Sequence, residues 1–179
     1  MGVYYNIDPA AVIALLSKMP ILKDPNFKVL EPCAGAGVLA KQYFLISKNP
    51  IDMIDIAPRQ DNIIQQDYMK FNCYGKYDVI ISTFPWGEDF SRLLNKALAD
   101  VKEGGYVVSF QRVSSLTSKE RYNSIYSRRR PEKILLFSRR LKCTKEDGKL
   151  IHSDKDFCWV IWHKVGGFYS LKTELEWVF

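Results

Sequence analysis

A glycine-rich turn is the first feature of this 179-residue sequence that could do chemistry. It lies in Val29-Leu30-Glu31-Pro32-Cys33-Ala34-Gly35-Ala36-Gly37, between an apolar strand pattern and a helical pattern. Glycines there let the backbone approach a ligand closely, and the N-terminus of the following helix favours anionic groups. Asp55 follows the next strand, at the roughly 20-residue separation at which an acid commonly binds ribose hydroxyls. These residues predict a site for a nucleotide-like cofactor.

The turn alone does not identify that cofactor. Gly35-x-Gly37-x-x-Ala40 also satisfies the dinucleotide-binding fingerprint, which matches many unrelated sequences by chance. A turn that needs glycine only for its backbone shape would show the same pattern. A nicotinamide cofactor and a purely structural turn both stay open on these residues, although no residues for hydride transfer can be identified.

Alternating apolar runs and turn signals predict the elements that position this turn. Strands are expected at 28–31, 51–56, 62–66, 77–83, 106–111, 133–138 and 157–162. Helices are expected from Pro9, with Asp8 as N-cap, over 36–47, over 89–102, and from a capping box at Thr117-Ser118-Lys119-Glu120 to about 128. The alternation predicts an α/β fold in which residues 1–179 form a single doubly wound, Rossmann-like domain with a seven-stranded, mostly parallel sheet.

The net charge of +6 is unevenly distributed. Residues 105–150 contain 12 Lys or Arg and 4 Asp or Glu, a charge of +8, so the remainder carries −2. A basic segment beside a nearly neutral remainder indicates a polyanionic partner such as nucleic acid. A solvated basic surface without a partner has the same composition.

Several other classes find no support in the sequence. No apolar run approaches the roughly 18 to 20 residues that span a bilayer, which argues against a membrane partner. The N-terminal segment has no signal-peptide pattern, so a cytoplasmic location is expected. The cysteines form no Cys-x-x-Cys pair, and their spacing to the histidines does not match a zinc site, so reduced thiols and no metal are expected. These residues are Cys33, Cys73, Cys143, Cys158, His152 and His163.

Glu31-Pro32-x-Ala34-Gly35-x-Gly37 resembles motif I of the N6-adenine-type amino-methyltransferases, which are class I S-adenosylmethionine-dependent enzymes. Phage-encoded members of similar length look closest, and the resemblance runs over nearly the whole chain. It implies S-adenosylmethionine as the cofactor. It also implies that residues 157–162 form an antiparallel last strand.

The resemblance assigns parts of the cofactor to individual residues. Glu31 and the Gly35–Gly37 backbone would hold the methionine part, and Asp55 would hold the ribose. Asp67 matches the acid that meets the adenine amino group, and Tyr5 lies where a Thr-Pro element flanks the cofactor in the family. The cofactor-binding residues expected in this way are Tyr5, Glu31, Pro32, Ala34, Gly35, Gly37, Asp55, Ile56, Asp67 and Tyr68.

Thr83-Phe84-Pro85-Trp86 corresponds to the (Asn/Asp/Ser)-Pro-Pro-(Tyr/Phe/Trp) signature of the same family. An exocyclic amine on a purine is a poor nucleophile, so two acceptors must bind its N–H groups and aim its lone pair at the methyl group. The Thr83 hydroxyl and the Phe84 carbonyl would be those acceptors, Pro85 would confine Phe84 to an extended backbone, and Trp86 would stack on the flipped base. Thr83 stands where the family has a stronger acceptor, and the loss of that acceptor should cost about 1 to 3 kcal/mol and weaken catalysis.

Arginines and lysines follow two later strands. Arg112 ends one, and Arg139 and Arg140 end another, so both groups should border the crevice at the carboxyl ends of the strands. The expected substrate-binding residues are Arg112, Arg139, Arg140 and Lys142, with Lys145 and Lys149 extending the patch. Arg128-Arg129-Arg130 ends a helix, where positive charge compensates the helix dipole.

The resulting hypothesis is methyl transfer to adenine N6 in DNA or RNA. Methylation of another nitrogen, such as guanine N2 or a protein glutamine, stays open. So does a catalytically inactive S-adenosylmethionine-binding protein or regulatory subunit. Nearly all of the chain is assigned to the catalytic core, with no separate target-recognition region, so specificity would come from short loops, substrate shape or a protein partner.

Overall fold

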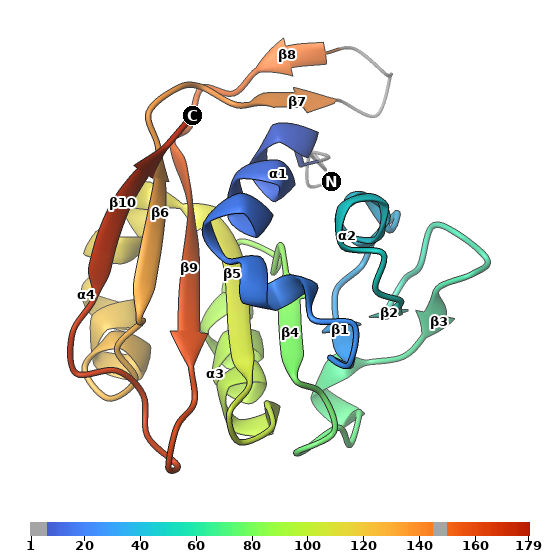
Figure 1. The fold of residues 1–179 in the computed structure, drawn as a ribbon, viewed down its shortest axis with the longest axis horizontal. Helices are drawn as coiled ribbons and strands as arrows, with labels where there is room; N and C mark the ends of the chain where they lie inside the picture. The colour runs from blue at the N-terminus through green and yellow to red at the C-terminus, as the bar shows by residue number, and fades with distance from the viewer. Residues whose placement is uncertain (1–6, 145–149) are drawn as a thin grey trace.

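The computed structural model describes residues 7–144 and 150–179, and an eight-stranded sheet forms its centre (Figure 1). Its strands are β1 (Val29–Glu31), β2 (Ile51–Asp55), β3 (Ile64–Gln65), β4 (Val79–Ser82), β5 (Tyr106–Arg112), β6 (Lys133–Phe137), β9 (Phe157–His163) and β10 (Glu174–Val178). They lie side by side in the order β10-β6-β9-β5-β4-β1-β2-β3. A separate hairpin consists of β7 (Lys142–Thr144) and β8 (Leu150–His152).

Helices cover both faces of this sheet (Figure 1). The helices α1 (Pro9–Lys18) and α2 (Val38–Ser47) lie on one face, and α3 (Phe90–Asp100) and α4 (Lys119–Arg121) lie on the other. Shorter helical turns are η1 (Pro20–Lys23), η2 (Tyr68–Lys70), η3 (Val113–Thr117) and the π-helical η4 (Tyr122–Tyr126). Within the described residues, no helix has both the length and the apolar character needed to traverse a lipid bilayer.

Most strands of the sheet run in the same direction. The five strands from β3 to β5 are parallel, β9 is inserted antiparallel between β5 and β6, and β10 is parallel to β6. Every residue of β4 is buried, which explains its unbroken apolar pattern in the sequence. The structure confirms the doubly wound α/β fold, the mostly parallel sheet and the antiparallel strand expected at 157–162.

Two expectations about the elements are wrong. The sheet has eight strands instead of seven because residues 174–178 add β10, whose alternating charged and apolar side chains are typical of a half-exposed edge. The helix expected over 117–128 is α-helical only in α4 and continues as the π-helical η4. Its N-cap is Ser118, which accepts the Arg121 N–H at 3.3 Å, and not the Thr117 of the expected capping box.

Strand β9 joins the two layers of the core. Successive β9 side chains point to opposite faces, so Trp159 packs on the α1 side and Trp162 on the α3 side. The Trp159 indole N–H donates to the Ala11 carbonyl at 2.8 Å, and the Trp162 indole N–H donates to the Arg129 carbonyl at 2.9 Å. Both indoles are therefore buried with their polar atom satisfied.

Asp8 connects the first helix to the hairpin. One carboxylate oxygen accepts the Ala10 N–H at 2.9 Å, which confirms the expected N-cap of α1. The other accepts the Lys142 N–H at 2.9 Å, where β7 begins. One side chain thus caps α1 and holds the hairpin at the end of the sheet where the parallel strands finish (Figure 1).

Substitution of Asp8 with alanine should remove both interactions. The free energy of unfolding should fall by about 1 to 2 kcal/mol, the usual effect of losing an N-cap with a second hydrogen bond. Urea unfolding followed by circular dichroism measures this change. Asp8→Asn is the matched control, because its amide retains one acceptor and should have an intermediate effect. Identical stability of Asp8→Ala and the wild type would contradict the role given to this carboxylate.

Candidate functional site

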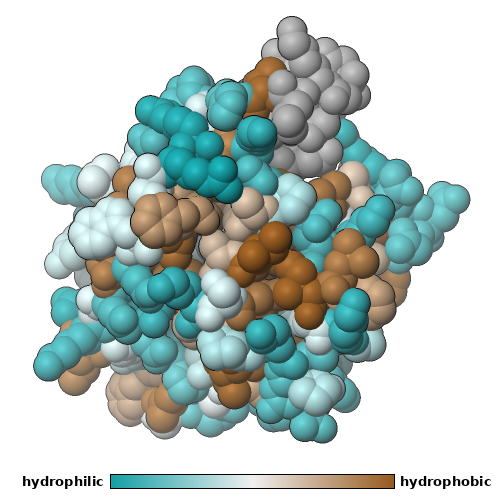
Figure 2. Space-filling model, turned by 45° about the horizontal axis from the view of Figure 1, so that its top comes forward, coloured by the Kyte–Doolittle hydropathy of each residue, from teal (hydrophilic) through white to brown (hydrophobic). Residues whose placement is uncertain are grey.

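The carboxyl ends of the parallel strands share one edge of the sheet, and the expected site residues follow these ends. The glycine turn follows β1, Asp55 ends β2, residues 83–86 follow β4, and Arg112 ends β5. Figure 2 turns this edge toward the viewer, where apolar surface is gathered among hydrophilic side chains. The topology therefore brings residues from four strands to one place, as expected for an open parallel sheet.

The glycine turn exposes its backbone. Gly35 and Gly37 have φ angles of 56° and 70°, in the left-handed region that glycine adopts without strain. The Gly37 N–H donates to the Ala34 carbonyl at 2.7 Å and closes the turn. A side chain at Gly35 would meet no atom within 4 Å, so open space lies beside the turn. Pro32 and Ala34, by contrast, are buried.

Asp55 braces this turn from the end of β2. Its Oδ2 accepts the Gly35 N–H at 2.7 Å, and its Oδ1 accepts the Ala57 N–H at 2.8 Å. A carboxylate has about four lone-pair positions, so Asp55 keeps acceptor capacity for ligand hydroxyls. Ile56 beside it is 67% exposed and offers an apolar surface at the same edge.

Glu31 lies deeper, with 1% of its surface exposed. Its Oε2 accepts the Ala40 N–H at 2.9 Å, in the first turn of α2, and so serves as a cap for that helix. Burial raises the pKa of the Glu31 carboxyl well above its ordinary value, and the nearby charge of Asp55 raises it further. A cationic ligand beside Glu31 would reverse this shift, because it favours the carboxylate.

Cys33 lies among the expected acids. Burial raises the pKa of its thiol, and the charges of Asp55, Glu31 and Asp67 act in the same direction. The structure therefore places all three acids near one residue that was expected to be only structural. The position of Cys33 inside the glycine-turn motif is the one sequence signal that could have indicated it.

Asp67 and Tyr68 border the same region. Asp67 accepts the Met69 N–H at 2.8 Å and begins η2, which fixes the direction of the carboxylate. Tyr68 is buried, and burial raises the pKa of its hydroxyl. The Lys96 ammonium lies 5.0 Å from the centre of the Tyr68 ring. Tyr5, also expected at the cofactor, lies outside the described residues.

The turn after β4 divides its residues between core and surface. The Phe84 side chain is buried and meets Phe90 edge-on, with 6.4 Å between ring centres. Pro85 is exposed, and Thr83 is partly buried. The Thr83 hydroxyl makes no hydrogen bond to any residue within 7–144 or 150–179.

Trp86 is already in contact with two side chains. Its ring stacks on Phe157 with 5.5 Å between centres, and the Arg112 guanidinium lies 4.4 Å from its centre. The indole Nε1 and the Arg112 Nε are buried without a partner among the described residues. Phe157 comes from β9, far away in the sequence, and was expected only as part of the last strand.

The basic residues divide into two groups. Arg112 reaches the turn, as expected. Arg139 and Arg140 follow β6, which is separated from β4 by β9 and β5, so they do not lie beside the turn after β4 as Arg112 does. Both are exposed, and Arg140 pairs with Asp156 at 3.3 Å. Lys142 is exposed on the hairpin, and Lys145 and Lys149 lie outside the described residues.

Comparison with known proteins finds matches to the fold of this chain but none to its sequence by family model or curated protein. A chain from Listeria monocytogenes assigned as a class I S-adenosylmethionine-dependent methyltransferase superimposes with a TM-score of 0.67 at 16% identity, over 93% of this chain. This protein has the class I methyltransferase fold. The mostly parallel sheet and the antiparallel β9 belong to this shared fold.

Two further class I structures show the same likeness. A chain assigned as a modification subunit of a type I restriction enzyme from Vibrio vulnificus has a TM-score of 0.60 at 13% identity, over 92% of this chain. The tRNA (m1A58) methyltransferase from Aquifex aeolicus has a TM-score of 0.59 at 14% identity, over 86%. This chain spans 63% of the Listeria chain, 45% of the Vibrio chain and 68% of the Aquifex chain. At these low identities the superpositions show a common fold.

The buried Glu31 should make stability depend on pH. The pKa of Glu31 is raised in the folded state above its ordinary value near 4.5, so its stabilising contribution is complete below that value and is lost as the pH rises through the folded pKa. Glu31→Gln keeps an acceptor for the Ala40 N–H but cannot ionise. The variant should therefore gain stability relative to wild type as the pH rises. Urea unfolding at a series of pH values measures this difference, and parallel curves would exclude it.

Proposed function

We propose that this protein transfers the methyl group of S-adenosylmethionine to an exocyclic amino group, most specifically adenine N6 in DNA or RNA. The class I methyltransferase fold supports the reaction class. Two structures with this fold are named as a restriction-enzyme modification subunit and a tRNA methyltransferase, which supports nucleic acid as the substrate class.

The residues at the strand ends fit the proposed cofactor. The bare backbone at Gly35 has open space beside it, so a ligand can approach closely. Asp55 retains acceptor positions suited to ribose hydroxyls, and Asp67 offers a second fixed carboxylate for an amino group. Glu31 supplies an acid beside the turn that a sulfonium or ammonium group would stabilise as its anion. When bound, S-adenosylmethionine supplies an electrophilic methyl group.

The arrangement of the turn after β4 carries the proposal. The Phe84 ring is anchored in the core against Phe90, and Pro85 restricts Phe84 to an extended backbone, so the Phe84 carbonyl has a fixed direction. The Thr83 hydroxyl beside it has no partner among the described residues and is free to accept a hydrogen bond. Two acceptors at adjacent positions can bind the two N–H groups of an exocyclic amine and direct its lone pair.

The basic side chains of the same edge would hold the nucleic acid. Arg112 lies closest to the turn, through its contact with Trp86. Arg139, Arg140 and Lys142 lie further along the rim, where they would contact phosphates and not bases. Such contacts give affinity without sequence information, so a protein partner or the shape of the substrate would supply specificity.

One observation favours the alternative of a cofactor-binding protein without catalysis. The Trp86 ring already contacts Phe157 and Arg112, the groups that would compete with a flipped base for its faces. Base stacking on Trp86 would stabilise a bound substrate by about 1 to 3 kcal/mol. Because Arg112 already covers the ring, the base would first have to displace it. A regulatory subunit would have no need for this exchange.

Methyl transfer to defined pools tests the proposed function directly. The protein is incubated with radiolabelled S-adenosylmethionine and with separate DNA, RNA and protein pools, and label should remain on DNA or RNA. Calorimetry with S-adenosylhomocysteine should show binding that Asp55→Ala weakens strongly. Label on protein alone would favour glutamine methylation. Cofactor binding without label in any pool would favour the regulatory alternative, and binding of NAD alone would exclude the assignment.

The turn variants distinguish a weak enzyme from an inactive one. Thr83→Asn should raise the rate of methyl transfer by about 5- to 100-fold, because it restores a stronger acceptor. Trp86→Ala should lower the rate, and neither variant should change cofactor affinity. Thr83→Val is the matched control, since it keeps the shape and removes the hydroxyl. Equal rates for Thr83→Val and wild type would show that the hydroxyl does not contact the amine.

A further inference from the structure

A groove lies on the face of the sheet covered by α3. It has a volume of about 1250 Å³ and runs between α3, the segment that follows η4, and the turn that precedes β10. Three parts of the chain that are distant in sequence therefore form its walls. The proposed catalytic turn does not line this groove.

The groove is strongly basic. Five of its lining residues carry a positive charge and none carries a negative one, namely Arg92, Lys96, Arg128, Arg129 and Arg130. Arg92 pairs with Asp89 at 2.7 Å, and Lys96 pairs with Asp100 at 2.6 Å, both from outside the lining. The three consecutive arginines form no ion pair with any residue in 7–144 or 150–179. Their charge is therefore available to an anionic ligand.

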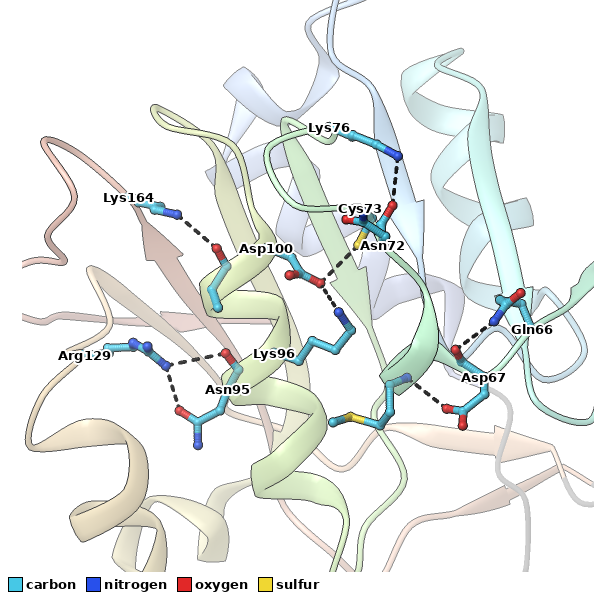
Figure 3. A network of polar contacts seen from close by, with 12 residues as sticks. Gln66, Asp67, Asn72, Cys73, Lys76, Asn95, Lys96, Asp100, Arg129 and Lys164 are labelled. Atoms are coloured by element: carbon cyan, nitrogen blue, oxygen red, sulfur yellow. Dashed lines mark hydrogen bonds and ion pairs between the residues drawn. The ribbon is translucent and has the colours of Figure 1, made fainter.

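The central arginine is held in place by polar contacts (Figure 3). The Nη1 of Arg129 donates to the Asn95 Oδ1 at 2.8 Å. The Arg129 carbonyl accepts the Trp162 indole N–H at 2.9 Å. A guanidinium has five N–H donors, so most of those of Arg129 remain available. A cation that is already oriented loses little side-chain entropy when it binds a phosphate.

An exposed aromatic residue stands on a turn in the lining segment that precedes β10, in which Ser170 pairs with Arg130. Phe168 is 77% exposed, and it pairs with Val165 across a turn closed by two backbone hydrogen bonds. Gly166 and Gly167 both adopt positive φ angles in that turn, and Glu103 accepts hydrogen bonds from their N–H groups. An aromatic ring held in this way provides a surface on which a base can stack.

The groove begins beside the proposed site. Met69 and Ser91 both line it, and they follow Asp67 and Trp86 closely in the sequence. Lys96 lies in the groove and its ammonium is 5.0 Å from the centre of the Tyr68 ring. A strand whose base enters the site therefore has a basic path along α3.

We propose that this groove binds the single-stranded flank of a nucleic acid, with arginine contacts to its phosphates and a base stacked on Phe168. The inference rests on the proposed function, because it deepens the substrate class to a single strand. Basic grooves with stacking rings bind single strands with little regard to sequence. Three consecutive arginines supply several positive charges, and the affinity for a nucleic-acid backbone grows with the number of phosphates that are neutralised.

Fluorescence anisotropy tests this proposal without any need for catalysis. The probes are fluorescein-labelled single strands of deoxythymidine or uridine, about ten nucleotides long, and a duplex of the same length. Wild type should bind the single strands more tightly than the duplex at low salt, and comparison of the two strands distinguishes DNA from RNA. Preference for the duplex would overturn the proposal.

Paired variants assign the binding to the groove. Arg128→Ala with Arg130→Ala should weaken single-strand binding about tenfold and reduce the salt slope by about one. The double variant Lys23→Ala with Lys41→Ala is the matched control, because it removes two exposed cations from the face of the sheet covered by α1 and α2. Phe168→Leu should weaken binding about fivefold or more, while Phe168→Trp should restore it. If the control pair weakens single-strand binding equally, the strand is attracted only by the overall charge of the protein, and the proposal is overturned.

Two further results separate this proposal from the proposed function. If Arg139→Ala with Arg140→Ala weakens binding and the groove variants do not, the groove is excluded and the site at the strand ends stands. If the groove variants weaken single-strand binding while no pool accepts label, the result supports the groove as the binding site and contradicts the proposed methyl transfer. Calorimetry with S-adenosylhomocysteine should give the same affinity for every groove variant, which shows that each variant is folded.

Discussion

The insertion of β9 between β5 and β6 holds both helix layers on the sheet. Trp159 reaches α1 and Trp162 reaches the segment after η4, each with a hydrogen bond from its indole to a backbone carbonyl. Because β9 runs opposite to both neighbours, β5 and β6 end at the same edge of the sheet. The same strand therefore brings Phe157 to Trp86 at that edge and, through the anchor at the Arg129 carbonyl, orders one wall of the basic groove.

The strand ends concentrate negative charge in a small space. Glu31, Asp55 and Asp67 each accept a hydrogen bond from a backbone N–H, which stabilises charges that lie close together. Burial raises the pKa of the Glu31 carboxyl, and the charge of Asp55 raises it further in the free protein. A ligand with positive charge would relieve this repulsion on binding. The acids thus favour a cationic ligand in the crevice, whereas the arginines favour an anionic one outside it.

Most of the fold could be predicted because strands buried on both faces have unbroken apolar sequences, as β4 does. The edge strand β10 lacks that signal, since its charged residues alternate with apolar ones. The π-helical η4 packs against α3, where the Asn95 side-chain amide donates to the Ser124 carbonyl at 3.3 Å, and local capping signals do not report such long-range contacts. The pairing of Trp86 with Phe157 joins distant residues through the order of strands, which spacing along the sequence does not determine.

The surroundings of Cys33 have a consequence for chemical selectivity. A thiolate is a far stronger nucleophile than a neutral thiol or an amine conjugated to a purine. Beside a methyl donor, an ionised cysteine would compete with the substrate and alkylate itself. Burial and three neighbouring carboxylates raise the pKa of the Cys33 thiol and keep it protonated. The acids that would bind the donor would thereby also protect the protein from self-methylation.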